Sequence, residues 1–82
     1  MAPIRIYTRS WCEDSQAAKE FLRKLHLAFE EVDIEKEPEA ARFVEAANGG
    51  KRRTPTFDVG GRTFHCSPFD EKKLRRELGL KK

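Results

Sequence analysis

The fold is decided by residues 4–34, which read IRIYTRSWCEDSQAAKEFLRKLHLAFEEVDI. Ile4 and Ile6 alternate with Arg5 and Tyr7, as the two faces of a β-strand require. Apolar residues then recur at the spacing of a helix face through residues 17–25, and alternation returns at residues 29–34. A strand, a helix and a second strand within about 30 residues predict a right-handed βαβ unit.

The second half of the chain begins with a helix and a hairpin. Pro38 suits the first turn of a helix whose apolar stripe stops at Asn48, where two glycines follow. Residues 56–59 and 62–65 flank the pair Gly60-Gly61, which favours a tight two-residue turn. The sequence therefore predicts two antiparallel strands after the second helix.

A last helix is predicted from the run Ser67-Pro68-Phe69-Asp70. Ser67 is the N-cap candidate, Pro68 would occupy the first helical position, and Asp70 would lie in the first turn. The apolar spacing continues to Gly79, where the helix should end. The full order is β-α-β-α-β-β-α, an α/β fold.

Composition limits the classes of partner. The chain has 82 residues and no linker rich in Pro, Gly or Ser, which predicts a single domain over residues 1–82. Its net charge is only +3, and the basic clusters, Lys81-Lys82 among them, alternate with acids. We therefore expect no nucleic-acid surface. No apolar run approaches the roughly 18 residues of a membrane span, so we expect no membrane partner.

The two cysteines indicate a reducing compartment. Two are too few for a disulfide-stapled secreted domain, and the first residues lack the apolar core of a secretory signal. We therefore expect a cytoplasmic protein.

Cys12 lies between the first predicted strand and the first predicted helix. A thiol at a helix N-terminus faces unpaired backbone N–H groups and the positive end of the helix dipole, which favour the thiolate. The alternative is a small buried hydrophobic residue whose sulfur takes no part in chemistry. Position alone makes Cys12 a candidate nucleophile.

Four stretches occur in an order and spacing that resemble one family: YTRSWC at 7–12, EVDIE at 31–35, NGG at 48–50 and TPT at 54–56. With them the chain resembles the glutaredoxins over essentially its whole length, and is most similar to the short mycoredoxin-like members. The resemblance implies a thioredoxin-like fold with a four-stranded mixed sheet flanked by helices. It also implies a thiol-disulfide oxidoreductase.

The resemblance assigns roles to several residues. Cys12 matches the nucleophile and Pro55 matches a cis-proline that faces it, so that the backbone of Thr54 is presented to an extended thiol substrate. Arg9 and Arg52 match positions that bind the carboxylates of glutathione or the polar part of another low-molecular-weight thiol. A planar guanidinium suits carboxylates because it donates two parallel hydrogen bonds.

Three further residues are candidates for substrate binding. Trp11 is expected to pack against the bound substrate, the alternative being an aromatic side chain that covers the sheet edge. Ser67 and Asp70 match the loop that receives the amino-acid end of the ligand, although capping of the last helix explains both of them as well.

Ser15 stands where dithiol members carry the resolving cysteine. A serine cannot expel the partner of a mixed disulfide, so the resemblance implies a monothiol route. In that route Cys12 accepts the thiol group and a second thiol molecule, acting as cosubstrate, restores it, with no tightly bound cofactor. Glu13 and Asp14 would raise the pKa of Cys12 by like charge, and Arg9 would oppose them.

Cys66 and the histidines have weaker indications. Cys66 follows the hairpin and could be an accessory redox thiol or a buried structural one. His26, at a helix end, is expected to interact with the dipole. Together with Cys12 and His65 these residues lack the paired spacing of a zinc site, so we expect no metal.

An alternative function is an iron–sulfur carrier. Some monothiol glutaredoxins hold a [2Fe–2S] cluster between two protomers, with one cysteine from each and two glutathiones, and Cys12 with Ser15 formally permits this. Those members share a Cys-Gly-Phe-Ser motif that this chain lacks. The expected partners are therefore a low-molecular-weight thiol and thiolated protein or small-molecule disulfides, and the expected state is a monomer.

Overall fold

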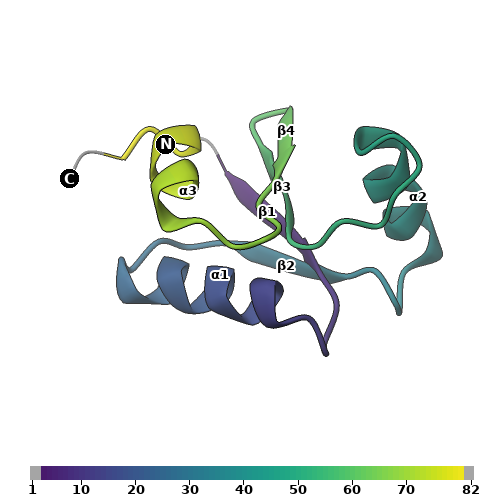
Figure 1. Ribbon diagram of the computed structural model, residues 1–82, viewed down its shortest axis with the longest axis horizontal. Coiled ribbons are helices and arrows are strands. Elements are labelled where there is room, and N and C mark those ends of the chain that lie inside the picture. The colour runs from purple at the N-terminus through teal and green to yellow at the C-terminus, as the bar shows by residue number, and fades with distance from the viewer. Residues whose placement is uncertain (1–2, 81–82) are drawn as a thin grey trace.

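Three helices and four strands follow one another in the predicted order (Figure 1). The computed structural model describes residues 3–80, so Lys81 and Lys82 and the two ends of the predicted domain lie outside it. The elements are β1 (Ile4–Thr8), α1 (Glu13–Lys24), β2 (Glu30–Asp33), α2 (Pro38–Ala47), β3 (Thr56–Val59), β4 (Arg62–His65) and α3 (Glu71–Glu77). The predicted α/β class is confirmed.

The strands form one mixed sheet in the order β2-β1-β3-β4. β1 runs parallel to β2 and antiparallel to β3, and β3 pairs antiparallel with β4. This leaves β2 and β4 as the two edges, each four residues long. Gly60 and Gly61 take φ values of 62° and 91°, which the tight turn between β3 and β4 needs.

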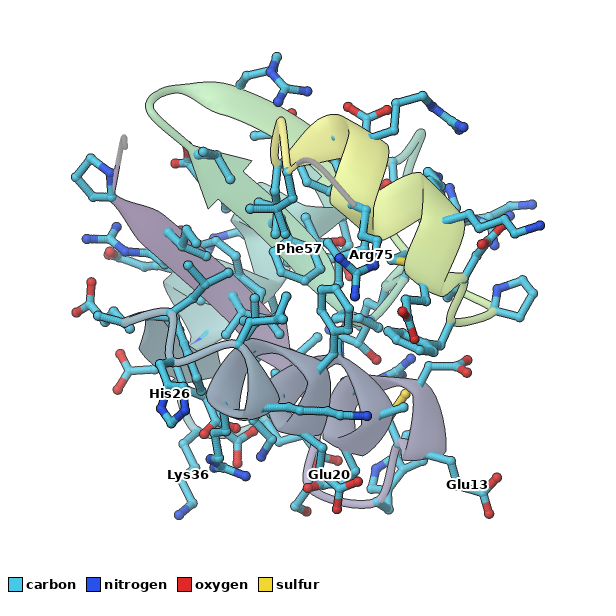
Figure 2. All side chains as sticks on the ribbon, turned by 90° about the vertical axis from the view of Figure 1, so that its left-hand side faces the viewer. Glu13, Glu20, His26, Lys36, Phe57 and Arg75 are labelled. Atoms are coloured by element: carbon cyan, nitrogen blue, oxygen red, sulfur yellow. The ribbon has the colours of Figure 1, made fainter. Side chains whose placement is uncertain are left out.

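Alternation along β1 divides the core between the two faces of the sheet. Ile4 and Ile6 join the larger cluster, in which residues of α1 and α3 pack around the fully buried Phe57 (Figure 2). Tyr7 faces the other way and joins Ile34, Ala41 and Val44 beneath α2. α1 and α3 therefore cover one face, and α2 covers the other.

Helix α1 carries a buried cation, Lys19. Lys19 donates to a carboxylate oxygen of Glu31 on β2 at 2.8 Å, and Thr8 at the end of β1 donates to the same oxygen at 2.7 Å. Burial of a charge is tolerated when it is paired and hydrogen-bonded. This network ties α1 to the carboxyl end of β1, immediately before the loop that carries Cys12.

The last helix begins later than predicted, and the expected N-cap is wrong. Ser67 and Pro68 are joined by a cis peptide bond outside the helix, and the N-cap is Asp70. The Asp70 carboxylate accepts from the N–H groups of Lys72 at 3.0 Å and Lys73 at 3.2 Å. Both serine and aspartate cap well, but the carboxylate also carries a charge that the positive end of the helix stabilises.

Within residues 3–80, none of the helices combines the length and the apolar character that a bilayer crossing needs.

Because Asp70 caps α3 and Ser67 does not, substitution of the two residues should change the free energy of unfolding by different amounts. Asp70→Ala should lower the free energy of unfolding by about 1 kcal/mol, because two N–H groups of α3 lose their acceptor. The matched variant Ser67→Ala should change it by less than about 0.5 kcal/mol. Urea denaturation followed by circular dichroism measures both. Equal losses in the two variants would contradict the N-cap assignment.

Candidate active site

Cys12 is the N-cap of α1 and faces the loop before β3. Its Sγ donates to the carbonyl oxygen of Thr54 at 3.3 Å, and the Thr54–Pro55 peptide bond is cis, as the resemblance implied. Cys12 is 8% exposed, so its side chain is covered on most sides yet reaches the surface. The structure therefore brings Cys12 to Thr54 and Pro55, which lie more than forty residues further along the sequence.

The surroundings of the sulfur favour its ionised form. Burial raises the pKa of the Cys12 thiol, but hydrogen bonds from the Thr54 and Ser15 side chains and from the backbone of Ser15 and Asp14 outweigh burial. The net shift of the pKa is downward. Donors aimed at a sulfur from the first turn of a helix stabilise its negative charge.

The sequence leaves open whether the two acids or Arg9 would decide the pKa of Cys12, and the net pKa is lowered by hydrogen bonds. Glu13 is exposed and points outward at the end of α1 (Figure 2). The Asp14 carboxylate accepts from the N–H of Phe69 at 3.0 Å, so it helps to hold the loop before α3. The hydrogen bond from Phe69 gives the Asp14 carboxylate a structural role that its neighbours in the sequence could not reveal.

Arg9 is bound to the protein itself. Its Nε donates to the Thr54 hydroxyl oxygen at 3.1 Å, and its Nη2 donates to the Arg52 carbonyl oxygen at 2.7 Å. Its guanidinium also lies 4.4 Å from the centre of the Trp11 ring. The expected carboxylate-binding residue therefore holds the loop that carries Pro55.

Trp11 is an exposed aromatic side chain held in place by polar groups. It is 63% exposed, and its Nε1 donates to the carboxylate of Glu35 at 2.9 Å. Ser10 contacts the other carboxylate oxygen of Glu35 at 3.4 Å. Sequence reasoning missed Glu35, because the residue is acidic like its neighbours and its contact with Trp11 depends on the fold.

Arg52 and His65 have basic side chains whose surroundings the structure defines. Arg52, expected to bind a carboxylate of the ligand, pairs with Glu45 at 2.6 Å. His65 has a lowered pKa, first because of burial and then because of the positive charges of Lys73 and Arg53. Lys73 and Arg53 therefore each act on His65, and neither was among the residues expected from the sequence.

The remaining candidates are mainly structural. Ser15 is fully buried, and among residues 3–80 its Oγ meets no hydrogen-bond partner, so its hydroxyl is a donor that favours the ionised sulfur of Cys12. Cys66 is also fully buried, and burial is the main cause of its raised pKa. Its sulfur accepts from the N–H of Asp70 at 3.3 Å, while the Ser67 hydroxyl lies 3.4 Å from His65. Cys12 and Cys66 are both free thiols.

Comparison with known proteins agrees with this arrangement. The glutaredoxin family model matches residues 4–64. A Mycobacterium tuberculosis protein named "Putative glutaredoxin Rv3198A" is 40% identical over 75 residues, which are 90% of this chain and 89% of that protein.

Two solved structures share the fold closely. The glutaredoxin from Methanosarcina mazei Go1 has a TM-score of 0.79 at 25% identity, covering 96% of this chain and 80% of that one. A mutant of the thioredoxin-like protein BC3987 has a TM-score of 0.76 at 30% identity, covering 99% of this chain and 100% of that one. Because the family model and the mycobacterial relative both match most of this chain, the chain belongs to the glutaredoxin family of thiol-disulfide oxidoreductases.

Proposed function

We propose that this glutaredoxin is a monothiol enzyme that removes glutathione, or a similar low-molecular-weight thiol, from mixed disulfides, with Cys12 as its nucleophile. The observation that carries the proposal is the position of the Cys12 sulfur at the N-terminus of α1, opposite Thr54, with hydrogen-bond donors that favour the thiolate. A thiolate is the attacking species in disulfide exchange.

The reaction has two exchange steps. In the first, the Cys12 thiolate attacks the glutathione sulfur of a mixed disulfide. A new disulfide forms between Cys12 and glutathione, the old disulfide breaks, and the released thiolate takes a proton from water. In the second, a glutathione thiolate attacks the adduct, which yields oxidised glutathione and returns the Cys12 thiolate. Each step exchanges one disulfide for another, and over the cycle free glutathione is the reductant that leaves as oxidised glutathione.

The second step requires a thiol from solution. Ser15 occupies the position of a resolving thiol but carries a hydroxyl, and Cys66 is fully buried and bonded to the backbone of Asp70. A burial-raised pKa also keeps Cys66 protonated and unreactive. These features support a monothiol route.

The substrate would bind along the loop that carries Pro55. The backbone of Thr54 would pair with the backbone of the bound thiol compound. The exposed ring of Trp11 would cover the exchanging sulfurs on the side away from Thr54. Arg52, Ser67 and Asp70 keep their proposed place at the ligand. Arg52 would have to share its bond with Glu45 when a ligand carboxylate arrives, and Ser67 and Asp70 would have to share theirs with the amino-acid end of the ligand.

The proposed setting is a monomer in the reducing cytoplasm. Glutathione or an analogous thiol serves as cosubstrate, and thiolated proteins or small-molecule disulfides are the substrates. The small number of cysteines supports a reducing compartment. The proposal includes no nucleic-acid or membrane partner.

Substitution of the two cysteines separates their roles. After incubation with oxidised glutathione, the wild-type protein should gain one glutathione, Cys12→Ser should gain none, and the matched variant Cys66→Ala should still gain one. Intact-mass spectrometry counts the adducts, and a coupled assay on a glutathionylated peptide measures turnover. Full activity of Cys12→Ser would overturn the assignment of the nucleophile.

The lowered pKa predicts how alkylation depends on pH. The rate of reaction of Cys12 with iodoacetamide should rise with pH as the thiolate forms, and reach half its maximum below the ordinary cysteine pKa of about 8.5. Peptide mapping by mass spectrometry follows Cys12 separately from Cys66. A midpoint at or above the ordinary value would contradict the proposed activation of Cys12.

The carrier alternative has a direct test. Under anaerobic conditions with iron, sulfide and glutathione, the enzyme proposed here should remain monomeric and show no visible charge-transfer bands. Absorption spectroscopy and gel filtration give the two readouts. A coloured dimer that requires both iron and glutathione, and that Cys12→Ser abolishes, would instead establish a [2Fe–2S] carrier.

A further inference from the structure

Asp14 lies in the first turn of α1, two residues after Cys12, and is bonded to the loop before α3. Its carboxylate oxygen Oδ1 accepts from the backbone N–H of Phe69 at 3.0 Å. The two residues are 55 positions apart in the sequence, so the fold alone brings them together. A negative charge therefore borders the loop at which the proposed function places the amino-acid end of the ligand.

The other backbone donors of this loop are also bonded to the protein. The N–H of Ser67 donates to Nδ1 of His65 at 3.3 Å, and the N–H of Asp70 donates to the sulfur of Cys66 at 3.3 Å. Pro68 has no N–H to donate. With Phe69 bonded to Asp14, each backbone N–H of residues 67–70 already has an acceptor within the protein.

A ligand carboxylate that reached this loop would meet a competitor for its donor. A carboxylate that leaves water needs donors to replace its lost hydrogen bonds. To gain the N–H of Phe69 it would have to displace Asp14, which the helix already holds at that place. Two carboxylates at one donor also repel each other. The loop therefore opposes a carboxylate both by its occupied donors and by its charge.

We infer that Asp14 is a specificity-determining residue that keeps a carboxylate away from this end of the site. Cys12 accordingly reacts faster with thiol compounds whose end at this loop is uncharged or cationic than with those that carry a carboxylate there. The inference rests on the proposed function and names its substrate class. Glutathione, which carries an α-carboxylate on its glutamyl residue, is then a slower partner than the same compound without that group.

Lys73 is the positive charge that competes with Asp14. It acts on Cys66 within this loop and on the adjacent His65. An ammonium ion on a flexible stem is strongly hydrated and is screened by water and salt, so its attraction for a ligand carboxylate is weak. Asp14, in contrast, is fixed on the donor that the carboxylate needs. If Lys73 dominated, the compound with the carboxylate would react faster.

Two disulfides that differ by one kind of carboxylate test the inference. The first is oxidised glutathione. The second is the disulfide of an analogue in which γ-aminobutyrate replaces the glutamyl residue, so that the amine and the glycine carboxylate remain. With either compound the Cys12 thiolate attacks one sulfur, forms a disulfide with it and releases the other half as a thiolate. Intact-mass spectrometry measures the rate at which each adduct forms.

The readout is the rate with the analogue divided by the rate with oxidised glutathione. A change in the pKa of Cys12 alters both rates equally, so the ratio reports recognition of the carboxylate. In the wild type the analogue should react about fivefold faster, as repulsion from one like charge would give. Asp14→Asn keeps an oxygen for Phe69 without the charge and should bring the ratio close to one. Asp14→Ala also frees the N–H and should lower the ratio below one.

Glu13→Gln is the matched control for Asp14→Asn. Glu13 is the acid next to Asp14 in the sequence, but it is exposed and points outward (Figure 2). Water screens its charge, so Glu13→Gln should keep the wild-type ratio within about twofold. Circular dichroism confirms that each variant is folded. If Asp14→Ala does not fold, Asp14→Asn decides alone, because it retains the bond from Phe69.

Three results would overturn the inference: a wild-type ratio of one or less, an unchanged ratio in Asp14→Asn, or an equal fall of the ratio in Glu13→Gln. The proposed function fails in a different way. In that case the wild type forms an adduct with neither disulfide, or Cys12→Ser forms the same adducts as the wild type. Adducts on Cys12 with a ratio that does not depend on Asp14 would remove only the inference.

Discussion

The antiparallel pairing of β1 with β3 is the constraint on which the site depends. Its register places Tyr7 opposite Thr56, so the loop that leaves β1 and the loop that enters β3 emerge at the same end of the sheet. Cys12 and Thr54 meet because of this register. A slip of one residue would reverse the face of every side chain on the strand and separate the sulfur from its partner.

The groups around the Cys12 sulfur come from two parts of the chain, one adjacent in sequence and one distant. The first turn of α1 supplies the N–H groups of Asp14 and Ser15, which sequence position alone brings to Cys12. The loop before β3 supplies the carbonyl and the hydroxyl of Thr54. Arg9 links the two loops and holds Trp11 beside them. The site is therefore a junction of two loops and one helix end, each kept in place by hydrogen bonds.

Much of this architecture could be predicted because periodicity and turn chemistry are local properties. The strands, the hairpin glycines and the position of Cys12 at a helix end all follow from neighbours within a few residues. The partners of Arg9 could not be predicted, because they lie 43 and 45 residues away in the sequence. The N-cap of α3 was misplaced for another reason: Ser67 and Asp70 are both good caps, and only the path of the chain between them decides.

The open edges of the sheet have a consequence for the behaviour of the protein at high concentration. β2 and β4 each expose backbone N–H and C=O groups that a strand from another chain could join. Both edges are four residues long, and β2 carries Glu30, Glu31 and Asp33 while β4 begins with Arg62. Short strands that carry charged side chains are poor templates for intermolecular sheets. The length and the charge of the two edge strands thus protect the sheet from pairing with a second molecule.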